Sequence, residues 1–445
     1  MPTKFDEPRS VERAAVELAA RVRAAAPVER GGFVRLETAV ESCDILQWLR
    51  RVAPGARRYF RDRSARLEIA GLGSATASPF GAHAALEQRG PQVETASASA
   101  WFVALPFDAA RARDDGWRAF DDHACVLPEI ELRREGESHV LAVNIAPGAD
   151  RDLLARALAA LETPCGRCVV EPALVREGDG TDEAEFSRAV RGALARIREG
   201  ALRKIVLART RRYAASGPLD GVAVLARLAA RESRGFRFLV EAGEGRAFLG
   251  VTPERLVSRS GRVARSEAVA GTRPRGVDGV ADRLLGESLL ASAKDRREHE
   301  LVVERVRDAL ASCATSVRVE NEPRLLRLAY VQHLATRVLA DVRAGVTDAD
   351  LVAALHPTPA VAGAPVAAAI AALREFEHFD RGLYAGPVGV VSRDGAELAV
   401  AIRSARIDGD RLTAFAGAGI VDGSDPAEEW RETGHKLLAF ERLAT

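Results

Sequence analysis

Residues 388–421 read VGVVSRDGAELAVAIRSARIDGDRLTAFAGAGIV, three apolar stretches joined by two turns that contain Asp-Gly. Asp-Gly fits the tight turns of β-hairpins, so this stretch predicts an antiparallel strand meander. A second hairpin is predicted for FRFLVEAGEGRAFLGVTPERLVSR at 236–259, with Gly243 and Gly245 in its turn. Helices and hairpins alternate along the chain without a regular βαβ rhythm. The predicted fold class is therefore α+β, with antiparallel sheets.

Helix signals occur at both ends of the chain and between the hairpins. Residues 11–26 have the apolar spacing of a helix, and Thr181 is expected to cap a second one. Residues 281–313 form a long helical stretch. The last helix is expected to open at residue 424 or 425, with Pro426 at its first position.

Composition and charge limit the class of protein. The chain has 445 residues, 47% hydrophobic and 29% charged, which is ordinary for a folded soluble protein. Its 64 Lys and Arg nearly balance 63 Asp and Glu, so no global field favours nucleic acid or an anionic membrane. The first ten residues lack the apolar core of a secretory signal, and no run approaches the roughly 20 apolar residues of a membrane helix. Five cysteines, an odd number, predict a reducing cytoplasm.

One segment is a candidate linker. Residues 171–185, EPALVREGDGTDEAE, are acidic, contain two glycines and lack periodicity. They would separate an N-terminal part, 1–170, from a C-terminal part, 180–445. The alternative is an internal loop within one integrated unit.

Two acidic pairs on predicted helices could bind a metal ion. Asp295 and Glu298 lie three residues apart, as do Glu429 and Glu432, so each pair shares one helix face. Lys436 falls one turn further along the second face. Four carboxylates could hold one hard cation such as Mg²⁺ through oxygen ligands. The alternative is structural, with Asp295 as a cap acceptor and Glu429 as a complement to a helix N-terminus.

Three further side chains could act on a small anion. Strand alternation places Arg403 among alanines, with room for a carboxylate, unless it is an ordinary edge-strand arginine. Lys204 opens the strand KIVLART and could serve as a base if buried, unless it reaches solvent. Glu267 precedes the small residues of SEAVAGTRPRG at 266–276, as expected of a carboxylate beside a backbone that approaches a ligand. The glycine-bearing turns match no nucleotide-binding loop.

Nine motifs follow one another between about residues 180 and 440: KIVLART, FLGVTPERL, SEAVAGTRPRG, KDRREHELVVERV, VQHLATRV, LHPTPAVAGAP, FDRGLYAGPVG, VAIRSARI and AGAGIVDGSDPAEEWRETGHK. In this order they resemble the chorismate-binding enzymes, which include anthranilate, aminodeoxychorismate, isochorismate and salicylate synthases. The N-terminal third is similar more loosely. The resemblance implies a large antiparallel β-sandwich flanked by helices, as one unit, with chorismate as the substrate.

A few positions discriminate within the family. Ala270 stands where aminodeoxychorismate synthases carry a nucleophilic lysine, which disfavours that activity. Lys204 is implied to mark enzymes that add water rather than ammonia. LHPTPAVAG and VQHLAT are similar to isochorismate synthases, and to the menaquinone type rather than the siderophore type. The implied function is an isochorismate synthase, monomeric and without a glutaminase subunit. The alternatives are salicylate synthase, anthranilate synthase component I and an inactive anion-binding homologue.

The resemblance also implies roles for the candidate residues. Glu267 would be the general acid that protonates the leaving ring hydroxyl, and Lys204 the general base that activates water. Mg²⁺ would bind Glu298 and Glu432, with Asp295 and Glu429 in support. The implied substrate-binding residues are Arg403, Tyr384, Gly417, Gly419, Lys436, His356, Thr358, Ala270, Gly271 and Thr272. Of these, His356 is expected to pack near the ring without transferring a proton.

Overall fold

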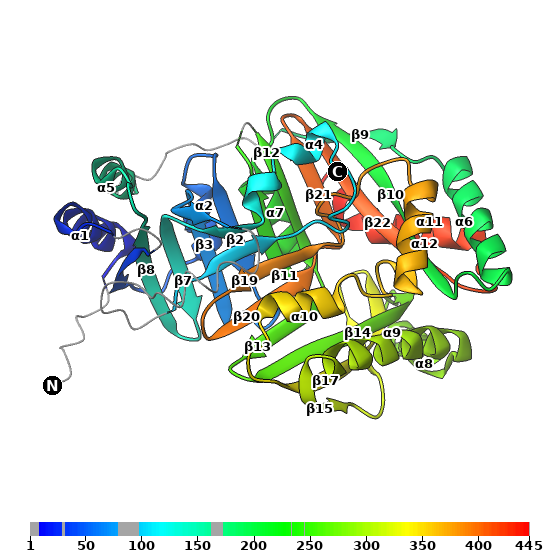
Figure 1. The fold of residues 1–445 in the computed structure, drawn as a ribbon. Helices are drawn as coiled ribbons and strands as arrows, with labels where there is room; N and C mark the ends of the chain where they lie inside the picture. The colour runs from blue at the N-terminus through cyan, green and yellow to red at the C-terminus, as the bar shows by residue number, and fades with distance from the viewer. Residues whose placement is uncertain are drawn as a thin grey trace.

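The computed structural model describes residues 9–28, 32–78, 98–161, 172–232, 234–243 and 245–444. Within these ranges the strands form one 12-stranded and one 10-stranded sheet. In both sheets, neighbouring strands pair antiparallel. Helices flank the two sheets (Figure 1). The predicted α+β fold with an antiparallel sandwich is confirmed.

Both sheets combine strands from distant parts of the sequence. The larger runs β1 (Val34–Ala39), β8 (Ser138–Ile145), β7 (Ile130–Glu135), β3 (Leu67–Leu72), β2 (Arg57–Arg61), β11 (Phe236–Glu241), β12 (Arg246–Thr252), β21 (Ser404–Asp408), β22 (Arg411–Ile420), β10 (Lys204–Ala215) and β18 (Gly363–Ala364), with β9 (Leu174–Asp179) on β10. The smaller runs β15 (Ala314–Val319), β17 (Val331–Val342), β14 (Val263–Pro274), β13 (Arg255–Ser260), β20 (Gly395–Val400), β19 (Pro387–Val391), β5 (Trp101–Ala104), β6 (Cys125–Leu127) and β4 (Thr76–Ala77), with β16 (Arg324–Arg327) on β17.

The larger sheet has an apolar core on each face, because successive side chains of a strand point to opposite sides. On β11, Phe236 and Phe238 lie in the core shared with the smaller sheet. Leu239, between Phe238 and Val240 of that shared core, belongs to the core under the outer helices. The central strands of this sheet therefore carry apolar residues on both faces, as in the run FRFLV of β11.

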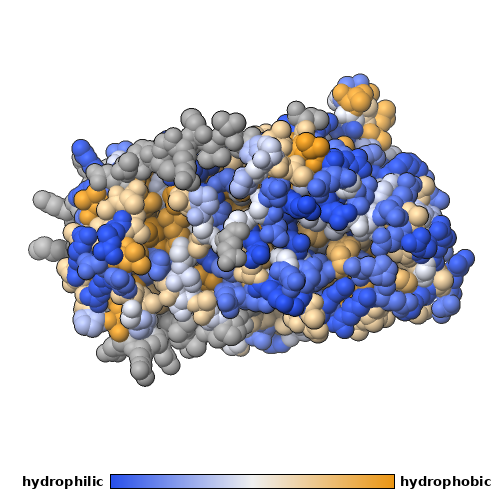
Figure 2. All heavy atoms as spheres, turned by 90° about the horizontal axis from the view of Figure 1, so that it is seen from above, coloured by the Kyte–Doolittle hydropathy of each residue, from blue (hydrophilic) through white to orange (hydrophobic). Residues whose placement is uncertain are grey.

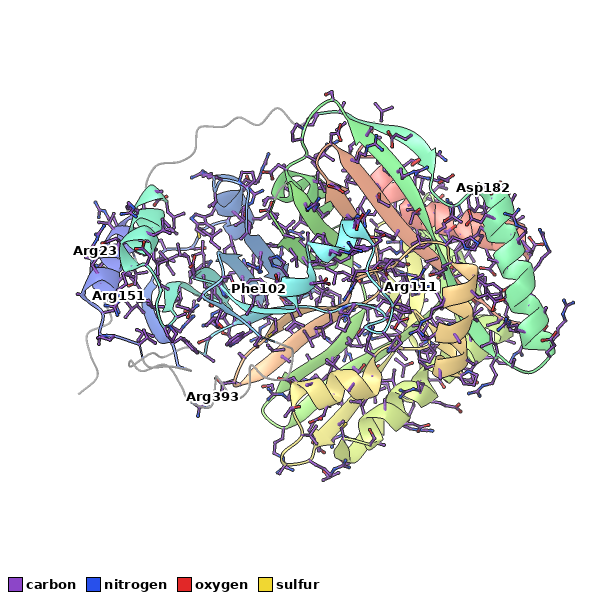
Figure 3. The ribbon with its side chains drawn as sticks, turned by 45° about the horizontal axis from the view of Figure 1, so that its top comes forward. Arg23, Phe102, Arg111, Arg151, Asp182 and Arg393 are labelled. Carbon is purple, nitrogen blue, oxygen red and sulfur yellow. The ribbon has the colours of Figure 1, made fainter. Side chains whose placement is uncertain are left out.

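The helices cover the outer faces of both sheets. The larger sheet carries α1 (Val11–Ala24), α2 (Ile45–Arg50), α5 (Arg151–Ala160), α7 (Gly221–Arg231) and α12 (Pro426–Glu441). On the smaller, α8 (Gly279–Ala291) and α9 (Ala293–Ala311) pack against β14 and β17. The remaining helices are α4 (Asp115–Arg118), α6 (Glu183–Arg198), α10 (Asp348–Leu355) and α11 (Val366–Phe376). Figure 3 shows Arg23 and Arg151 where α1 meets α5, and there Arg23 Nε lies 3.5 Å from Asp152.

Two of the places where the chain passes from one sheet to the other are neighbours. Pro253 and Glu254 join β12 to β13, and residues 401–403 join β20 to β21. Each crossing is hydrogen-bonded to the strand that leads into the other. Val400 N of β20 donates to Glu254 O at 3.0 Å, and Val251 N of β12 donates to Arg403 O at 3.2 Å. Arg403 has φ 52°, a left-handed conformation that costs a non-glycine residue roughly 1 kcal/mol or more. The prediction of a continuous strand through Arg403 was therefore wrong.

Three other sequence-based boundaries need correction. The predicted linker, as far as it is described, contains β9 and the start of α6, and β9 pairs with β10. The cap of α6 is Asp182 rather than Thr181, since the Asp182 side chain accepts from Glu185 N. The long helix expected over 281–313 is two helices, separated at Ser292, whose side chain caps α9. Asp425 caps α12 with Pro426 following, as predicted.

The N-terminal and C-terminal parts share one sheet, because β2 pairs with β11 from Arg58–Val240 to Arg61–Arg237. The seam between the parts thus lies inside a hydrogen-bonded sheet. This continuity agrees with the alternative of one integrated unit.

Across the described ranges, no helix is both long and apolar enough to cross a membrane. On the face shown in Figure 2, hydrophilic residues cover most of the right half, and hydrophobic side chains gather at the left, where Figure 1 places the N-terminal elements.

Candidate active site

A cavity of about 390 Å³ opens where the two crossings meet strands of both sheets and the helices α9 and α12. Its walls combine carboxylates, ammonium and guanidinium groups with small residues. The polar side chains that line it are Lys204, Glu254, Thr272, Arg273, Ser292, Lys294, Asp295, Glu298, His333, Tyr384, Arg403, Glu428, Glu429, Glu432 and Lys436. Such a mixture suits a small, multiply charged molecule better than an apolar one.

Lys204 enters the cavity from the first position of β10. Its side chain is 2% exposed, and Nζ donates to Glu298 Oε1 at 2.8 Å. Gly419 on β22 leaves the space for this pair, since a Cβ there would lie 3.0 Å from Glu298 Oε1 and 3.1 Å from Lys204 Cε. The predicted buried lysine is therefore present, with a carboxylate as its partner.

Glu254 lies in the same cavity, at the first crossing. It is 4% exposed. Burial raises the pKa of Glu254 to about 8, with Lys204 opposing and Glu267 adding to the shift. At neutral pH this carboxyl group keeps its proton, so it can act as an acid.

The acidic pairs predicted on two helices face this cavity from α9 and α12. Glu432 accepts from Lys436 Nζ at 2.7 Å, and Asp295 accepts from Arg273 Nη2 at 2.7 Å. Burial, and then the charge of Glu432, raise the pKa of Glu429 to about 7.

No set of three or more His, Cys, Asp or Glu side chains converges as metal ligands within the described ranges. Yet Glu298 and Glu432 each already hold a cation, the ammonium of a lysine. Crowded carboxylates that hold ammonium groups are hard oxygen donors, and they fit a magnesium ion.

Arg403 and Tyr384 form one wall of the cavity. Arg403 Nη2 lies 3.4 Å from His333 Nε2. On its other side, His333 Nδ1 lies 3.1 Å from both Gly271 O and Thr272 Oγ1. Burial lowers the pKa of His333 to about 3, so it is neutral and can hold the guanidinium without competing charge. Gly271, at φ 74° within a bulge of β14, turns its carbonyl toward this histidine.

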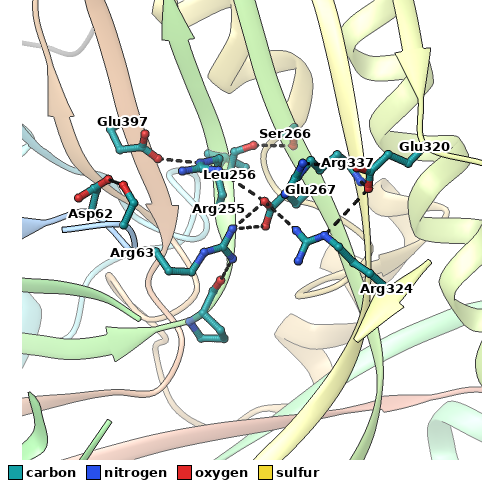
Figure 4. Close-up of polar contacts among 12 residues, drawn as sticks. Asp62, Arg63, Arg255, Leu256, Ser266, Glu267, Glu320, Arg324, Arg337 and Glu397 are labelled. Atoms are coloured by element: carbon teal, nitrogen blue, oxygen red, sulfur yellow. Dashed lines mark hydrogen bonds and ion pairs between the residues drawn. The ribbon is translucent and has the colours of Figure 1, made fainter. Parts of the chain in front are cut away.

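Glu267 lies outside the cavity lining, contrary to the role expected for it. Figure 4 shows the arginines that surround its carboxylate. Its carboxylate accepts from Arg63 Nη2 at 2.6 and 2.8 Å, from Arg324 Nη2 at 3.2 Å and from Arg255 Nη1 at 3.4 Å. Burial alone would raise the pKa of Glu267, but the three guanidinium groups outweigh it and lower the pKa. An ionised carboxylate enclosed by arginines cannot serve as the general acid.

His356 also lies outside the cavity lining, as does Thr358. His356 Nε2 is 3.1 Å from Phe107 O, so this histidine connects the end of α10 to the N-terminal part. It does not face the cavity, where a substrate ring would lie. Thr358 is beside Glu254 and influences its pKa. The other sequence-based candidates line one cavity together: Lys204, Ala270, Gly271, Thr272, Asp295, Glu298, Tyr384, Arg403, Gly417, Gly419, Glu429, Glu432 and Lys436.

Glu254 and His333 were not predicted as site residues, although they lie in the motifs FLGVTPERL and VQHLATRV. The signal for Glu254 was Pro253, since proline interrupts a ladder and marks where a strand ends. A carboxylate directly after such a break is free to leave the sheet. For His333, within the strand VQHLATRV, the sequence offered no comparable signal.

A sequence model of the family described as chorismate binding enzyme matches residues 20–443. The chain belongs to this family. Among curated chorismate-binding relatives, the salicylate biosynthesis isochorismate synthase of Pseudomonas aeruginosa is 40% identical over 75% of this chain and 72% of its own length. Isochorismate synthase MenF of Bacillus subtilis is 34% identical over 76% of this chain and 72% of its own length.

Solved structures of chorismate-binding enzymes match as well. The menaquinone-specific isochorismate synthase MenF from Escherichia coli superposes with a TM-score of 0.86 and 27% identity, covering 98% of this chain and 100% of that one. Anthranilate synthase component I from Streptococcus pneumoniae, at 20% identity and a TM-score of 0.64 over 93% of this chain and 92% of that one, shares the fold.

Proposed function

We propose that this chorismate-binding enzyme is an isochorismate synthase, which converts chorismate to isochorismate. The observation that carries the proposal is the presence of Lys204 and a protonated Glu254 in one cavity. The relatives named isochorismate synthase support it.

The reaction needs an acid and a base together. A ring hydroxyl is a poor leaving group, so Glu254 gives its proton to that oxygen as the carbon–oxygen bond breaks and water departs. At the other end of the diene a second water bonds to the ring, and the proton of that water passes to the Lys204 side chain as general base. The diene electrons shift from the new bond toward the carbon that loses the hydroxyl. Return of the proton from Lys204 to Glu254 restores the enzyme, and the net reaction is an isomerisation.

The substrate carboxylates would be held on opposite walls. The Arg403 guanidinium can bind one carboxylate in a bidentate manner, and the Tyr384 hydroxyl can donate to the same carboxylate. Lys436, whose Nζ also donates to Gly417 O at 2.8 Å, lies on the α12 side. Gly417 has to stay small, because a Cβ there would lie 3.1 Å from Tyr384 Oη.

Magnesium belongs to the same proposal. Glu298 and Glu432 would hold the ion, with Asp295 and Glu429 in support. When bound, Mg²⁺ neutralises a substrate carboxylate and draws electron density from the ring. Its arrival would require Lys204 and Lys436 to release the two carboxylates they now pair with.

Product analysis tests the proposal. The purified chain is incubated with chorismate and Mg²⁺, without ammonia, and the products are separated by chromatography. Isochorismate alone is the expected result. Salicylate with pyruvate would assign the chain to the salicylate synthases, and anthranilate formed only with ammonia would assign it to the anthranilate synthases. No turnover would leave an anion-binding homologue.

The cellular setting proposed is a menaquinone-type pathway in the cytoplasm, which the structural match to menaquinone-specific MenF supports. A monomer without a glutaminase subunit is part of this proposal, since water replaces ammonia as the nucleophile. Light scattering of the purified chain checks the monomer.

A further inference from the structure

Arg63 lies at the tip of the β2–β3 hairpin and contacts two segments of the catalytic region. Its Nη1 donates to the Pro253 carbonyl at 2.9 Å, and its Nη2 donates to both oxygens of Glu267, at 2.6 and 2.8 Å. The side chain is 17% exposed, and that of Glu267 is 2% exposed. One guanidinium from the N-terminal part thus joins the first crossing to β14.

The position of Arg63 is fixed from several sides. Within its hairpin, the Asp62 side chain accepts from Leu67 N at 3.0 Å and from the Ser64 hydroxyl. The guanidinium carbon lies 5.5 Å from the centre of the Phe236 ring. A planar guanidinium with two hydrogen-bonded partners and an aromatic ring beside it has little conformational freedom left, so Arg63 is already ordered before a substrate binds.

The Pro253 carbonyl belongs to the same planar peptide unit as the Glu254 nitrogen. Pro253 has no N–H to donate, so the crossing lacks one backbone hydrogen bond that another residue could make. On the far side of Glu254, its own carbonyl accepts a hydrogen bond from Val400 N at 3.0 Å. Arg63 bonds to the near side, so both peptide units that flank the Glu254 α-carbon are hydrogen-bonded.

We infer that Arg63, anchored by Glu267, is a positioning residue that orients the Glu254 carboxyl group in the cavity. This inference rests on the proposed function for the role of Glu254. It also explains why Glu267 stands before the small residues of AVAGT: from β14, it anchors the arginine that fixes the opposite wall of the cavity. The N-terminal part thereby contributes to a site whose lining comes from the C-terminal part.

Three variants separate positioning from simple stabilisation. Arg63→Gln removes both contacts. Arg63→Lys keeps the charge beside Glu267, but one ammonium cannot reproduce the planar fork that spans Glu267 and Pro253. The matched control is Arg324→Gln, which also removes a guanidinium from Glu267 but makes no contact with the crossing.

The readouts are kcat and KM for chorismate, the thermal midpoint, and a crystal structure of each variant. We expect kcat to fall roughly tenfold or more in both Arg63 variants, with KM within about twofold of wild type. Arg324→Gln should keep its kcat within about twofold of wild type, even if its thermal midpoint falls as much as that of the Arg63 variants. In the crystal structures, residues 253–254 should shift only in the Arg63 variants.

Equal losses of kcat in Arg63→Gln and Arg324→Gln would overturn the inference, as would wild-type kcat in Arg63→Lys or an unmoved Glu254. The crystal structures decide this without any turnover. Inactive wild-type enzyme would instead count against the proposed function, so the two failures are distinguishable.

Discussion

Replacing Glu254 with Gln should stabilise the protein at neutral and alkaline pH while it stops catalysis. Burial raises the pKa of Glu254 from 4.5 to about 8. Between these values the folded state keeps a proton that the unfolded state has lost, so the free energy of unfolding falls as pH rises. At about 1.4 kcal/mol per pH unit, the loss reaches about 3 kcal/mol at pH 7 and about 5 kcal/mol above pH 8. Gln is neutral throughout and avoids this cost.

Urea denaturation of wild type and Glu254→Gln at pH 5, 6, 7 and 8 measures the difference. The stability of the variant relative to wild type should increase by about 1.4 kcal/mol per unit, while kcat falls by roughly two to four orders of magnitude. Glu267→Gln, measured also from pH 5 down to pH 3, is the control with the opposite sign: the pKa of Glu267 is lowered from 4.5, so its contribution is present from pH 5 upward and is lost only as pH falls below that value. A stability difference for Glu254→Gln that stays constant with pH would refute the raised pKa, and unchanged kcat would remove Glu254 from the acid role.

Further predictions concern the base, the metal ligands and the glycine of β22. Lys204→Ala should lose at least about a hundredfold in kcat and keep magnesium-dependent chorismate binding, measured by calorimetry; near-normal turnover would exclude Lys204 as the base. Glu298→Gln and Glu432→Gln should each raise the Mg²⁺ concentration for half-maximal activity about tenfold or more, and a wild-type magnesium titration would make that carboxylate structural. Gly419→Ala should reduce kcat about tenfold or more, because its Cβ would meet Glu298 and Lys204 at 3.0 and 3.1 Å, whereas Gly217→Ala, with nothing within 4 Å, should not; equal effects would contradict the steric argument.

The fold could be predicted largely from hairpin turns and apolar periodicity, but its boundaries could not. β9 was mistaken for a linker because, among the described strands, it pairs only with β10 and has little apolar pattern: Val175 is 65% exposed. It is held instead by charge, since Asp179 accepts from Arg209 and Arg211 at 2.9 and 2.7 Å. Partners 30 and 32 residues away are not visible in a local pattern.

Most of the cavity lining followed from the order of the motifs, since each motif occupies one strand or helix of the same fold. The acid did not. Glu267 and Glu254 both stand in quoted motifs, and the difference between them is made by Arg63 and Arg324, which are 204 and 57 residues from Glu267. Only the folded structure shows that three arginines keep one carboxylate ionised while burial keeps the other protonated.

The adjacency of the two crossings has a mechanical consequence. A displacement of one backbone segment is passed to the segment to which it is hydrogen-bonded. The carbonyl of Glu254 accepts from the strand that leads to Arg403, and the carbonyl of Arg403 accepts from the strand that leads to Glu254. When one crossing shifts, the other is therefore drawn with it, so the proposed acid and Arg403 keep their mutual spacing while other walls of the cavity move.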